Sequence, residues 1–354
     1  MDTLTHALSG ALLARATEPR AGRSPLPRRT RMAVGFLSAA FPDSDFVLSF
    51  GDPLTYLATH RGVTHSLLML PLWAIALAFA FHLLYRRRYP WRAFVGVCAL
   101  SLAAHIAGDV ITSFGTMVLA PLSEWRAALP VTFIIDPYFT GIIVAGLVAS
   151  HLARDSRPAA AAASLVLAAY VGFQGVLRVH ALRIGDAYAQ AQQLEGAAAH
   201  ALPQPFSPFH WMVVVEQPDA YHLSYVSLIR REARRTPPDA GFLRRVYDSY
   251  RPVDDAFWMR VPRYGDAPED AAAAQAFWES DVFAPYRRFA MFPNAYRIAR
   301  DGGRVCVWFA DLRFALVGRT MPFRYVGCRA DGADAWDVRS VDEPDDPGVF
   351  RAID

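Results

Sequence analysis

The chain has 354 residues, 53% of them hydrophobic, and its mean hydropathy is positive at +0.17. Lysine is absent, and the net charge of +3 is too small to indicate a nucleic acid or another polyanion as a partner. The only cysteines are Cys98, Cys306 and Cys328, so the sequence predicts neither a disulfide scaffold nor a thiolate zinc site.

The first half contains several apolar segments. A spanning helix needs about 20 mostly apolar residues, and three segments reach that length: 66–85, 93–112 and 132–152. A fourth, 158–177, is rich in alanine and is the weakest. Two shorter or interrupted stretches precede them, 3–14 and 32–50, and the second is broken by "FPDSDF". The sequence therefore predicts a mainly α fold, a polytopic bundle of transmembrane helices.

Arginines in the short connections predict the orientation of this bundle. They occupy three connections: Arg15, Arg20, Arg23, Arg28, Arg29 and Arg31; Arg86, Arg87, Arg88 and Arg92; Arg154 and Arg157. The positive-inside rule places all three in the cytoplasm. With alternating spans, everything after residue 178 then lies on the external side, provided that 158–177 spans. The chain is thus predicted to cross its membrane several times.

Ionisable residues interrupt this apolar background at five places. They are His6 in "THALSG", Asp43 and Asp45 in "FPDSDF", His60 and His65 in "HRGVTHS", His105 and Asp109 in "HIAGD", and Asp136 in "FIIDPYF". In the predicted orientation all of them fall near the external ends of their segments, at one depth. Ionisable groups within a membrane cost roughly 2.5–3.5 kcal/mol each and are usually functional. The pattern therefore predicts one common site.

The residue types favour a metal. His105 and Asp109 stand four apart, so both side chains project from one face of a helix. Histidine and carboxylate ligands without thiolate are typical of zinc, manganese or iron. The eight candidates exceed what one tetrahedral ion uses, so we predict two or three ions, zinc first and manganese as an alternative. In "HRGVTH" we predict a turn before a span at Ser66, with Thr64 as a candidate N-cap.

A structural interpretation competes with this one. His105 and Asp109 could form a buried hydrogen-bonded pair that steadies the bundle, and Asp43 and Asp45 could belong to a loop at the membrane surface. Five such elements at one depth favour the metal site over a structural network.

With these motifs in view, the first half resembles the YdjM family of bacterial membrane-bound, predicted metal-dependent hydrolases. "THALSG", "FPDSD", "HRGVTHS" and "HIAGDVITSFGT" follow one another in that order over residues 1–140. That family is similar, at a distance, to zinc-dependent phospholipase C and the S1/P1 nucleases, which cleave phosphodiesters with three zinc ions held by His and Asp. The resemblance implies a metal core of this kind and a location in a bacterial inner membrane.

The same resemblance implies a ligand set. It consists of His6, an Asp of "PDSD", one His of "HRGVTH", and the pair His105 and Asp109. The nucleases and phospholipases also use a downstream His pair and a Glu on a helix. After Asp109 only Asp136 is placed to substitute for them, so two ions are as consistent with the resemblance as three.

The second half has a different character. Alternating and β-branched runs predict an antiparallel sheet, with helices near 240–250 and 271–290. The strand-like runs are 211–216, 221–229, 305–317 and 323–330. We predict a membrane-embedded metal-binding domain over 1–177 and an extracytoplasmic α+β domain over 178–354, where Cys306 and Cys328 could pair.

The predicted function is that of a membrane-bound metal-dependent hydrolase. Its substrate would be a lipid or lipid-linked phosphoester at the external leaflet, because the site lies at that depth. The metals would activate water, and Asp43 or Asp45 would orient that water or act as base. Arg61 would clamp a phosphate or play an interfacial structural part. The alternative is a non-catalytic, metal-stabilised scaffold or regulator. A metal transporter ranks third, since it would need polar groups at several depths. No particular protein partner is predicted.

Overall fold

The computed structural model describes residues 1–19, 25–153, 156–234, 236–237 and 239–341. The chain divides into two compact units. The first comprises Met1–Gly51 and Thr59–Val176, and the second comprises Asp52–Ala58 together with the described part of Leu177–Asp354. Three of the connection arginines on which the predicted orientation depends, Arg20, Arg23 and Arg154, lie outside the described residues.

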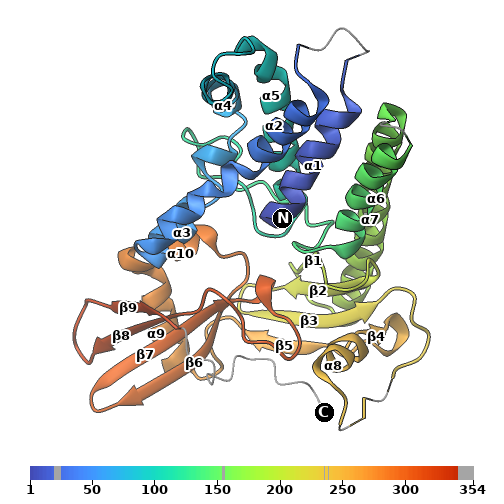
Figure 1. Cartoon of the computed structure of the whole chain (residues 1–354). Coiled ribbons are helices and arrows are strands. Elements are labelled where there is room, and N and C mark those ends of the chain that lie inside the picture. Colours follow the sequence, from blue (N-terminus) through green and yellow to red (C-terminus); the bar gives the residue numbers. More distant parts are fainter. Residues whose placement is uncertain (20–24, 154–155, 235, 238, 342–354) are drawn as a thin grey trace. The chain divides into compact units, whose positions relative to one another are not determined.

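The first unit is built of helices (Figure 1). They are α1 (Thr3–Ala16), α2 (Arg28–Ala40), α4 (Leu70–Leu84), α5 (Arg92–Val110), α6 (Pro137–Leu152) and the first part of α7 (Arg157–Ala191). Two short 3-10 helices, η1 (Pro42–Phe50) and η2 (Val63–His65), also belong to it. The short helix α3 (Pro53–Thr59) falls almost entirely within the segment assigned to the second unit.

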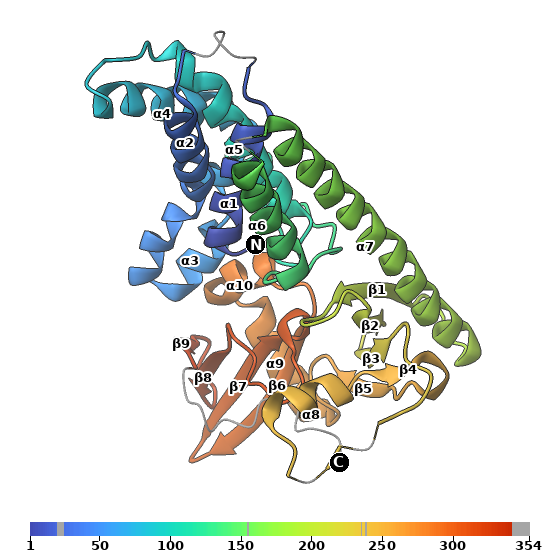
Figure 2. The same ribbon diagram turned by 45° about the vertical axis from the view of Figure 1, so that its right-hand side comes forward.

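Two of these helices, α5 and α7, are long and apolar enough to cross a membrane. Residues Pro53–His65, which include α3 and η2, are followed by α4 after a bend of 76°. If this bent pair counts as one span, the number of candidate spans rises to three. The segment 158–177, predicted to be the weakest, thus belongs to the longest helix, which has 35 residues. Figure 2 shows α7 as one continuous helix.

The structure shortens two of the predicted spans. Residues 132–136 precede α6, because the side chain of Asp136 caps that helix by accepting from the backbone N–H groups of Tyr138 and Phe139. Helix α6 has only 16 residues as a result. Helix α4 begins at Leu70 and has no side-chain cap. The prediction that Thr64 caps this helix is therefore wrong. The Thr64 hydroxyl instead contacts Asp45 and His65.

Small residues set how closely the first helices pack. Where α1 crosses α2, a Cβ added to Gly10 would lie 2.2 Å from the carbonyl oxygen of Gly35, and one added to Gly35 would lie 2.5 Å from that of Gly10. Side chains beyond glycine would therefore separate the two backbones, as in other closely packed membrane helices. A buried apolar cluster fills the space beside this crossing, with Val34 of α2, Ala78 of α4 and Phe94 of α5 among its members.

The second unit contains two sheets rather than the single antiparallel sheet predicted. One has the order β1-β2-β3-β4, with β5 paired to β3 and β4 parallel to β3; the other has the antiparallel order β6-β7-β8-β9. The strands are β1 (Ala198–Pro203), β2 (His210–Glu216), β3 (Ala220–Ser227), β4 (Arg251–Pro252), β5 (Met259–Pro262), β6 (Pro293–Asp301), β7 (Arg304–Asp311), β8 (Tyr325–Ala330) and β9 (Asp337–Ser340). The remaining elements are α8 (Phe242–Asp248), α9 (Pro268–Glu279), α10 (Ala284–Phe289), η3 (Val253–Asp255), η4 (Asp281–Phe283) and η5 (Leu312–Phe314).

Burial on both faces explains why β2 reads as a continuous apolar run. Trp211 and Val213 pack in a cluster with Ala181 of α7 on one face. Met212 and Val214 face the opposite way and pack in a second cluster that contains Phe292, next to the second sheet. A strand covered on both sides has no polar face, so its sequence does not alternate.

A disulfide cross-links two strands of the second sheet. Cys306 and Cys328 lie opposite each other in the register of β7 and β8 and form a disulfide. The third cysteine, Cys98, is a buried free thiol in α5. The pairing that the sequence only allowed is therefore present in the structure.

The crossing of α1 and α2 makes a testable prediction. Gly35→Ala should lower the thermal stability of the full-length protein in detergent, because overpacking of this kind typically costs about 1–3 kcal/mol. Gly96→Ala, in the exposed part of α5 where no atom lies within 4 Å of an added Cβ, should leave stability unchanged or raise it, since alanine favours helix more than glycine. Equal melting temperatures for the two variants would contradict the close crossing.

Candidate metal centre

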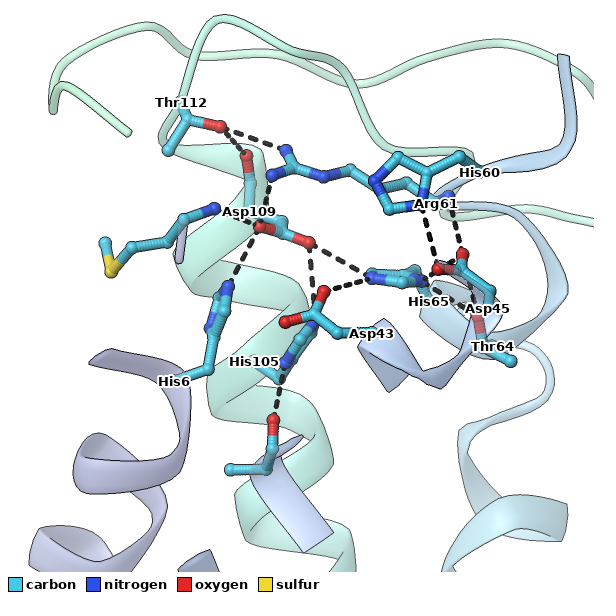
Figure 3. Close-up of polar contacts among 12 residues, drawn as sticks. His6, Asp43, Asp45, His60, Arg61, Thr64, His65, His105, Asp109 and Thr112 are labelled. Atoms are coloured by element: carbon cyan, nitrogen blue, oxygen red, sulfur yellow. Dashed lines mark hydrogen bonds and ion pairs between the residues drawn. The ribbon is translucent and has the colours of Figure 1, made fainter. Parts of the chain in front are cut away.

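The centre is organised by the last two turns of α5. His105 and Asp109 project from the same face of this helix, and neither is accessible to solvent. Gly108 lets α1 approach that face, because a Cβ at this position would lie 3.0 Å from the ring of His6. The rings of His6 and His105 then stack with their centroids 3.7 Å apart. Figure 3 shows these side chains converging with others from η1 and η2.

Four residues form a group that could hold a metal ion: Asp43, His65, His105 and Asp109. Their potential ligand atoms all lie within 4.8 Å of one another. Nε2 of His65 lies 3.5 Å from Oδ1 of Asp43 and 3.3 Å from Oδ2 of Asp109. Nε2 of His105 lies 3.6 Å and 3.4 Å from the same two oxygens. Two imidazoles and two carboxylates thus surround one point.

These distances suit a tetrahedral ion better than hydrogen bonds. A tetrahedron with metal–ligand bonds of roughly 2.0–2.2 Å has edges of about 3.3–3.6 Å, and the four N–O distances given above fall in this range. Charge-assisted hydrogen bonds are shorter, about 2.7–2.9 Å. Nε2 of His65, Nε2 of His105 and Oδ2 of Asp109 are also buried without a hydrogen-bond partner among the described residues. Such atoms are costly unless something else binds them.

Hydrogen bonds on the far side of each imidazole fix its orientation. Nδ1 of His105 lies 2.6 Å from the carbonyl oxygen of Ala39, which can only accept, so Nδ1 carries the proton and Nε2 presents its lone pair to the centre. Nδ1 of His65 lies 2.9 Å from the hydroxyl of Thr64. Partners of this kind are typical of metal-ligating histidines, because they set the tautomer and the ring orientation.

The two carboxylate oxygens of Asp109 have different neighbours. Oδ2 faces His65 and His105, whereas Oδ1 receives Nε2 of His6 at 3.0 Å, the guanidinium of Arg61 at 2.9 Å and the amino group of Met1. The orientation of the carboxylate is therefore determined by donors outside the four-residue group.

Arg61 connects the two carboxylate-bearing segments. Its backbone N–H donates to Oδ2 of Asp45 at 3.0 Å, while its side chain donates to Asp109 and to the hydroxyl of Thr112. The guanidinium also lies 4.6 Å from the centroid of Phe114, and the residue is only 2% exposed. All these contacts are internal to the protein, so the structure gives Arg61 a supporting position beside the centre.

Two groups at the centre, Asp43 and His6, have shifted pKa values. Burial raises the pKa of Asp43, but hydrogen bonding to His65 and the proximity of His105 and His6 lower it by more, so its pKa lies below the usual range. Asp43 is therefore an anion at neutral pH. Burial, followed by the nearby His105, lowers the pKa of His6 to about 3, against the opposing influence of Asp109, so His6 is neutral.

The sequence-predicted residues take three different positions. Asp43, His65, His105 and Asp109 lie together. His6, Asp45 and His60 lie around them: His6 contacts Asp109, and Oδ1 of Asp45 lies 2.8 Å from Nδ1 of His60. Asp136 caps α6, and its other oxygen accepts from Tyr170 at 2.8 Å. The structure thus gives Asp136 partners outside the four-residue group.

Sequence reasoning missed three supporting groups. The carbonyl of Ala39 carries no signal, because a backbone acceptor has no residue type. Thr112 and Phe114 follow Asp109 closely in "GDVITSFGT", and their contacts with Arg61 depend on the turn after α5. The helical spacing of the motif could have suggested Thr112, which stands three residues after Asp109.

A helical membrane protein with a buried cluster of histidine and aspartate is the class that fold and site define. A family model described as "YdjM inner membrane protein" matches residues 1–181, and the chain belongs to this family. The resemblance drawn from the motifs is therefore confirmed. A similar protein, described as "Uncharacterized protein YfhP", comes from Bacillus subtilis (strain 168) and is 28% identical over 143 residues.

The match with that relative is partial. It covers 39% of this chain and 42% of the length of the Bacillus protein. No solved structure matches the chain, so the expected likeness to a phospholipase C or P1 nuclease core stays a prediction.

We predict that the full-length protein binds a divalent transition metal, zinc foremost, through the four-residue group. Asp109→Asn and His105→Ala should each reduce the metal content measured by elemental analysis to background. Asp136→Asn is the matched control, since it removes the same charge from a residue outside the group and should retain the metal. Metal-free wild-type protein after incubation with zinc, or full retention in Asp109→Asn, would contradict the assignment.

Proposed function

We propose that the protein is a membrane-bound metal-dependent hydrolase that acts on a lipid or lipid-linked phosphoester at the external leaflet. The observation that carries this proposal is the group of Asp43, His65, His105 and Asp109, whose potential ligand atoms lie within 4.8 Å of one another and include three buried atoms without a hydrogen-bond partner among the described residues. Membership of an inner-membrane family supports the location in a membrane, whereas the external leaflet is part of the proposal. Ion number, zinc or manganese identity and the hydrolysed bond are parts of the proposal.

The chain's own residues would divide the work as follows. Asp43, His65, His105 and Asp109 would hold the metal, which when bound would lower the pKa of a water and offset negative charge on a phosphoryl oxygen. Asp45 would keep the role of base that the sequence suggested, since it lies outside the four-residue group. Arg61 would act as a positioning residue rather than a phosphate clamp, because its guanidinium is engaged by Asp109 and Thr112.

Access to the centre supports an enzyme. The side chains of His65, His105 and Asp109 are fully buried, whereas that of Asp43 is 14% exposed. Water and substrate would therefore approach along η1, where Asp43 lies. A purely structural ion would be more stable with no open side.

Exposed apolar residues near that approach support a lipid substrate. Residues of η1 directly after the two carboxylates are largely exposed: Phe46, Val47, Leu48 and Phe50. Leu122 and Trp125, in the segment after α5, are exposed as well. Apolar surface of this extent marks a membrane or partner contact in most proteins, and around this site it suits an amphiphilic molecule.

One observation favours the alternative, a non-catalytic, metal-stabilised scaffold. The four ligands come from η1, η2 and α5, so a bound ion would cross-link three segments that are distant in sequence. A structural metal does this too, and its binding free energy then contributes directly to folding. The two proposals differ in one measurable property: an enzyme hydrolyses a substrate, whereas a scaffold does not.

We predict metal-dependent hydrolysis of an amphiphilic phosphoester in detergent or liposomes, tested on a panel of phospholipids and polyprenyl phosphates. A soluble analogue without the lipid tail should react poorly, because binding of the remote chain would position the reacting group. His65→Ala should lose orders of magnitude in rate, since metal and activated water would be lost together, whereas the control Asp136→Asn should remain active. If no substrate turns over and His65→Ala still complements a deletion strain, the scaffold takes the place of the enzyme.

We also predict that the second unit is extracytoplasmic, as the arginine-rich connections indicate. Reporters fused after Arg88 and after Asp354 should report the cytoplasm and the external side, respectively. The disulfide between Cys306 and Cys328 fits an oxidising compartment. In denatured protein isolated without reductant, one thiol, that of Cys98, should be reactive. A cytoplasmic signal at Asp354 together with three reactive thiols would refute this topology.

A further inference from the structure

An exposed apolar patch lies beside the metal centre, on two segments outside the long helices. The first segment is 63–68, just before α4, and the second is 117–125, in the connection between α5 and α6. Leu122 is 83% exposed and Trp125 62%. A single exposed apolar residue is normal in a protein, whereas a group of them marks a contact surface. The exposed side chains of this patch are those of Val63, Leu67, Leu68, Leu119, Leu122 and Trp125.

Hydrogen bonds join the two segments into one surface. The backbone N–H of Leu67 donates to the carbonyl oxygen of Val118 at 2.9 Å. The hydroxyl of Ser66 donates to the carbonyl oxygens of Val118 and Ala120, at 3.2 and 2.6 Å. Ser66 directly follows His65, one of the four residues that could hold the metal. The patch is therefore an immediate neighbour of the centre.

The end of α5 sets the level of this patch relative to a membrane. Helix α5 is a candidate span of 19 residues, and a helix of that length is about 28 Å long, close to the roughly 30 Å of the hydrocarbon core. When α5 crosses the membrane, its last residue, Val110, thus lies near the boundary between hydrocarbon and headgroups. Nε2 of His65 lies 3.3 Å from Oδ2 of Asp109, one residue before Val110, so the first segment is at this level.

The second segment begins and ends at the same level. It follows α5 directly, and the chain returns to the end of that helix after the patch, because the backbone N–H of Leu129 donates to the carbonyl oxygen of Val110 at 2.7 Å. Neither 62–85 nor 110–123 contains an Asp, Glu, Lys or Arg. Trp125 stands between Glu124 and Arg126, and tryptophan is enriched where hydrocarbon meets headgroups.

The backbone of the second segment has internal hydrogen-bond partners. Thr116 and Ala127 exchange two backbone hydrogen bonds of 2.9 Å, and the N–H of Ala120 donates to the carbonyl oxygen of Met117 at 3.1 Å. Backbone groups need such partners wherever lipid replaces water, because acyl chains form no hydrogen bonds. These residues can therefore contact lipid without leaving those groups unpaired.

We propose that the patch contacts lipid in the leaflet at the end of α5, at the boundary between hydrocarbon and headgroups. Leu122 and Trp125 insert into that leaflet, and Leu67 and Leu68 continue the contact toward the start of α4. The contact keeps the neighbouring metal centre at the level of the headgroups. The inference rests on membrane insertion of the helical unit and not on any reaction at the centre.

The test measures the surroundings of single nitroxide labels on the full-length protein in liposomes. Leu122→Cys and Leu68→Cys are each made in a Cys98→Ala background, where no other free thiol remains because Cys306 and Cys328 form a disulfide. Power saturation compares the collisions of each label with oxygen, which concentrates in hydrocarbon, and with a water-soluble nickel chelate. Both labels should give an oxygen-to-nickel ratio several-fold above that of the control Asp334→Cys, in an exposed turn between β8 and β9.

Phe79→Cys, at an exposed position within α4, provides the hydrocarbon reference and should give the highest ratio. A ratio at 122 or 68 equal to that of Asp334→Cys would show that the patch faces water and would overturn the proposal. A label that neither reagent reaches would overturn it as well, because protein would then cover the patch. Each variant should keep the melting temperature of its Cys98→Ala parent. The two labels lie on separate segments, so either one decides if the other variant does not fold.

Discussion

The burial of Asp109 is the constraint on which the helical unit depends. A carboxylate with no solvent access inside an apolar bundle is very costly unless charges and hydrogen bonds compensate it. Here Arg61 and His6 donate to one oxygen, and the imidazoles of His65 and His105 face the other. Each of these side chains comes from a different element, so satisfying one buried charge fixes how α1, η2 and α5 meet.

The supporting contacts all involve atoms that face away from the centre of the four-residue group. The carbonyl of Ala39 orients His105, Thr64 orients His65, and Asp45 holds the backbone of Arg61. A network that existed only for stability would pair the inner atoms with one another at hydrogen-bond distance. Instead the outer atoms are paired and the inner ones are left at the edge lengths of a coordination tetrahedron. This distribution of contacts is what a site that could hold a metal ion requires, because the outer hydrogen bonds orient the inner donor atoms toward one point.

Close packing of small residues makes this arrangement possible. Gly10 and Gly35 allow α1 to approach α2, and Gly108 allows His6 to approach α5. The same device recurs in the second unit, where Gly185 brings α7 against β1 and β2, and Gly327 accommodates the ring of Phe277. At these five positions glycine permits close approach rather than an unusual backbone conformation, so it determines how near a helix or strand lies to its neighbour.

The sequence by itself determined the elements with strong local signals. Helical spacing placed His105 and Asp109 on one face, uncharged runs identified α5 and the first part of α7, and motif order identified the family. It also found all four residues of the candidate ligand group among its eight candidates. These inferences succeeded because periodicity, apolar length and motif order are properties of neighbouring residues.

Only the tertiary structure decided which candidates form the group and which support it. His60 and His65 are indistinguishable within "HRGVTH", yet His65 faces Asp109, while His60 pairs with Asp45. Asp136 reads as one more intramembrane carboxylate until its contacts with the start of α6 and with Tyr170 are visible. The division of the second half into two sheets was equally hidden. The physical reason is that these choices depend on contacts between residues far apart in the chain, about which local patterns carry no information.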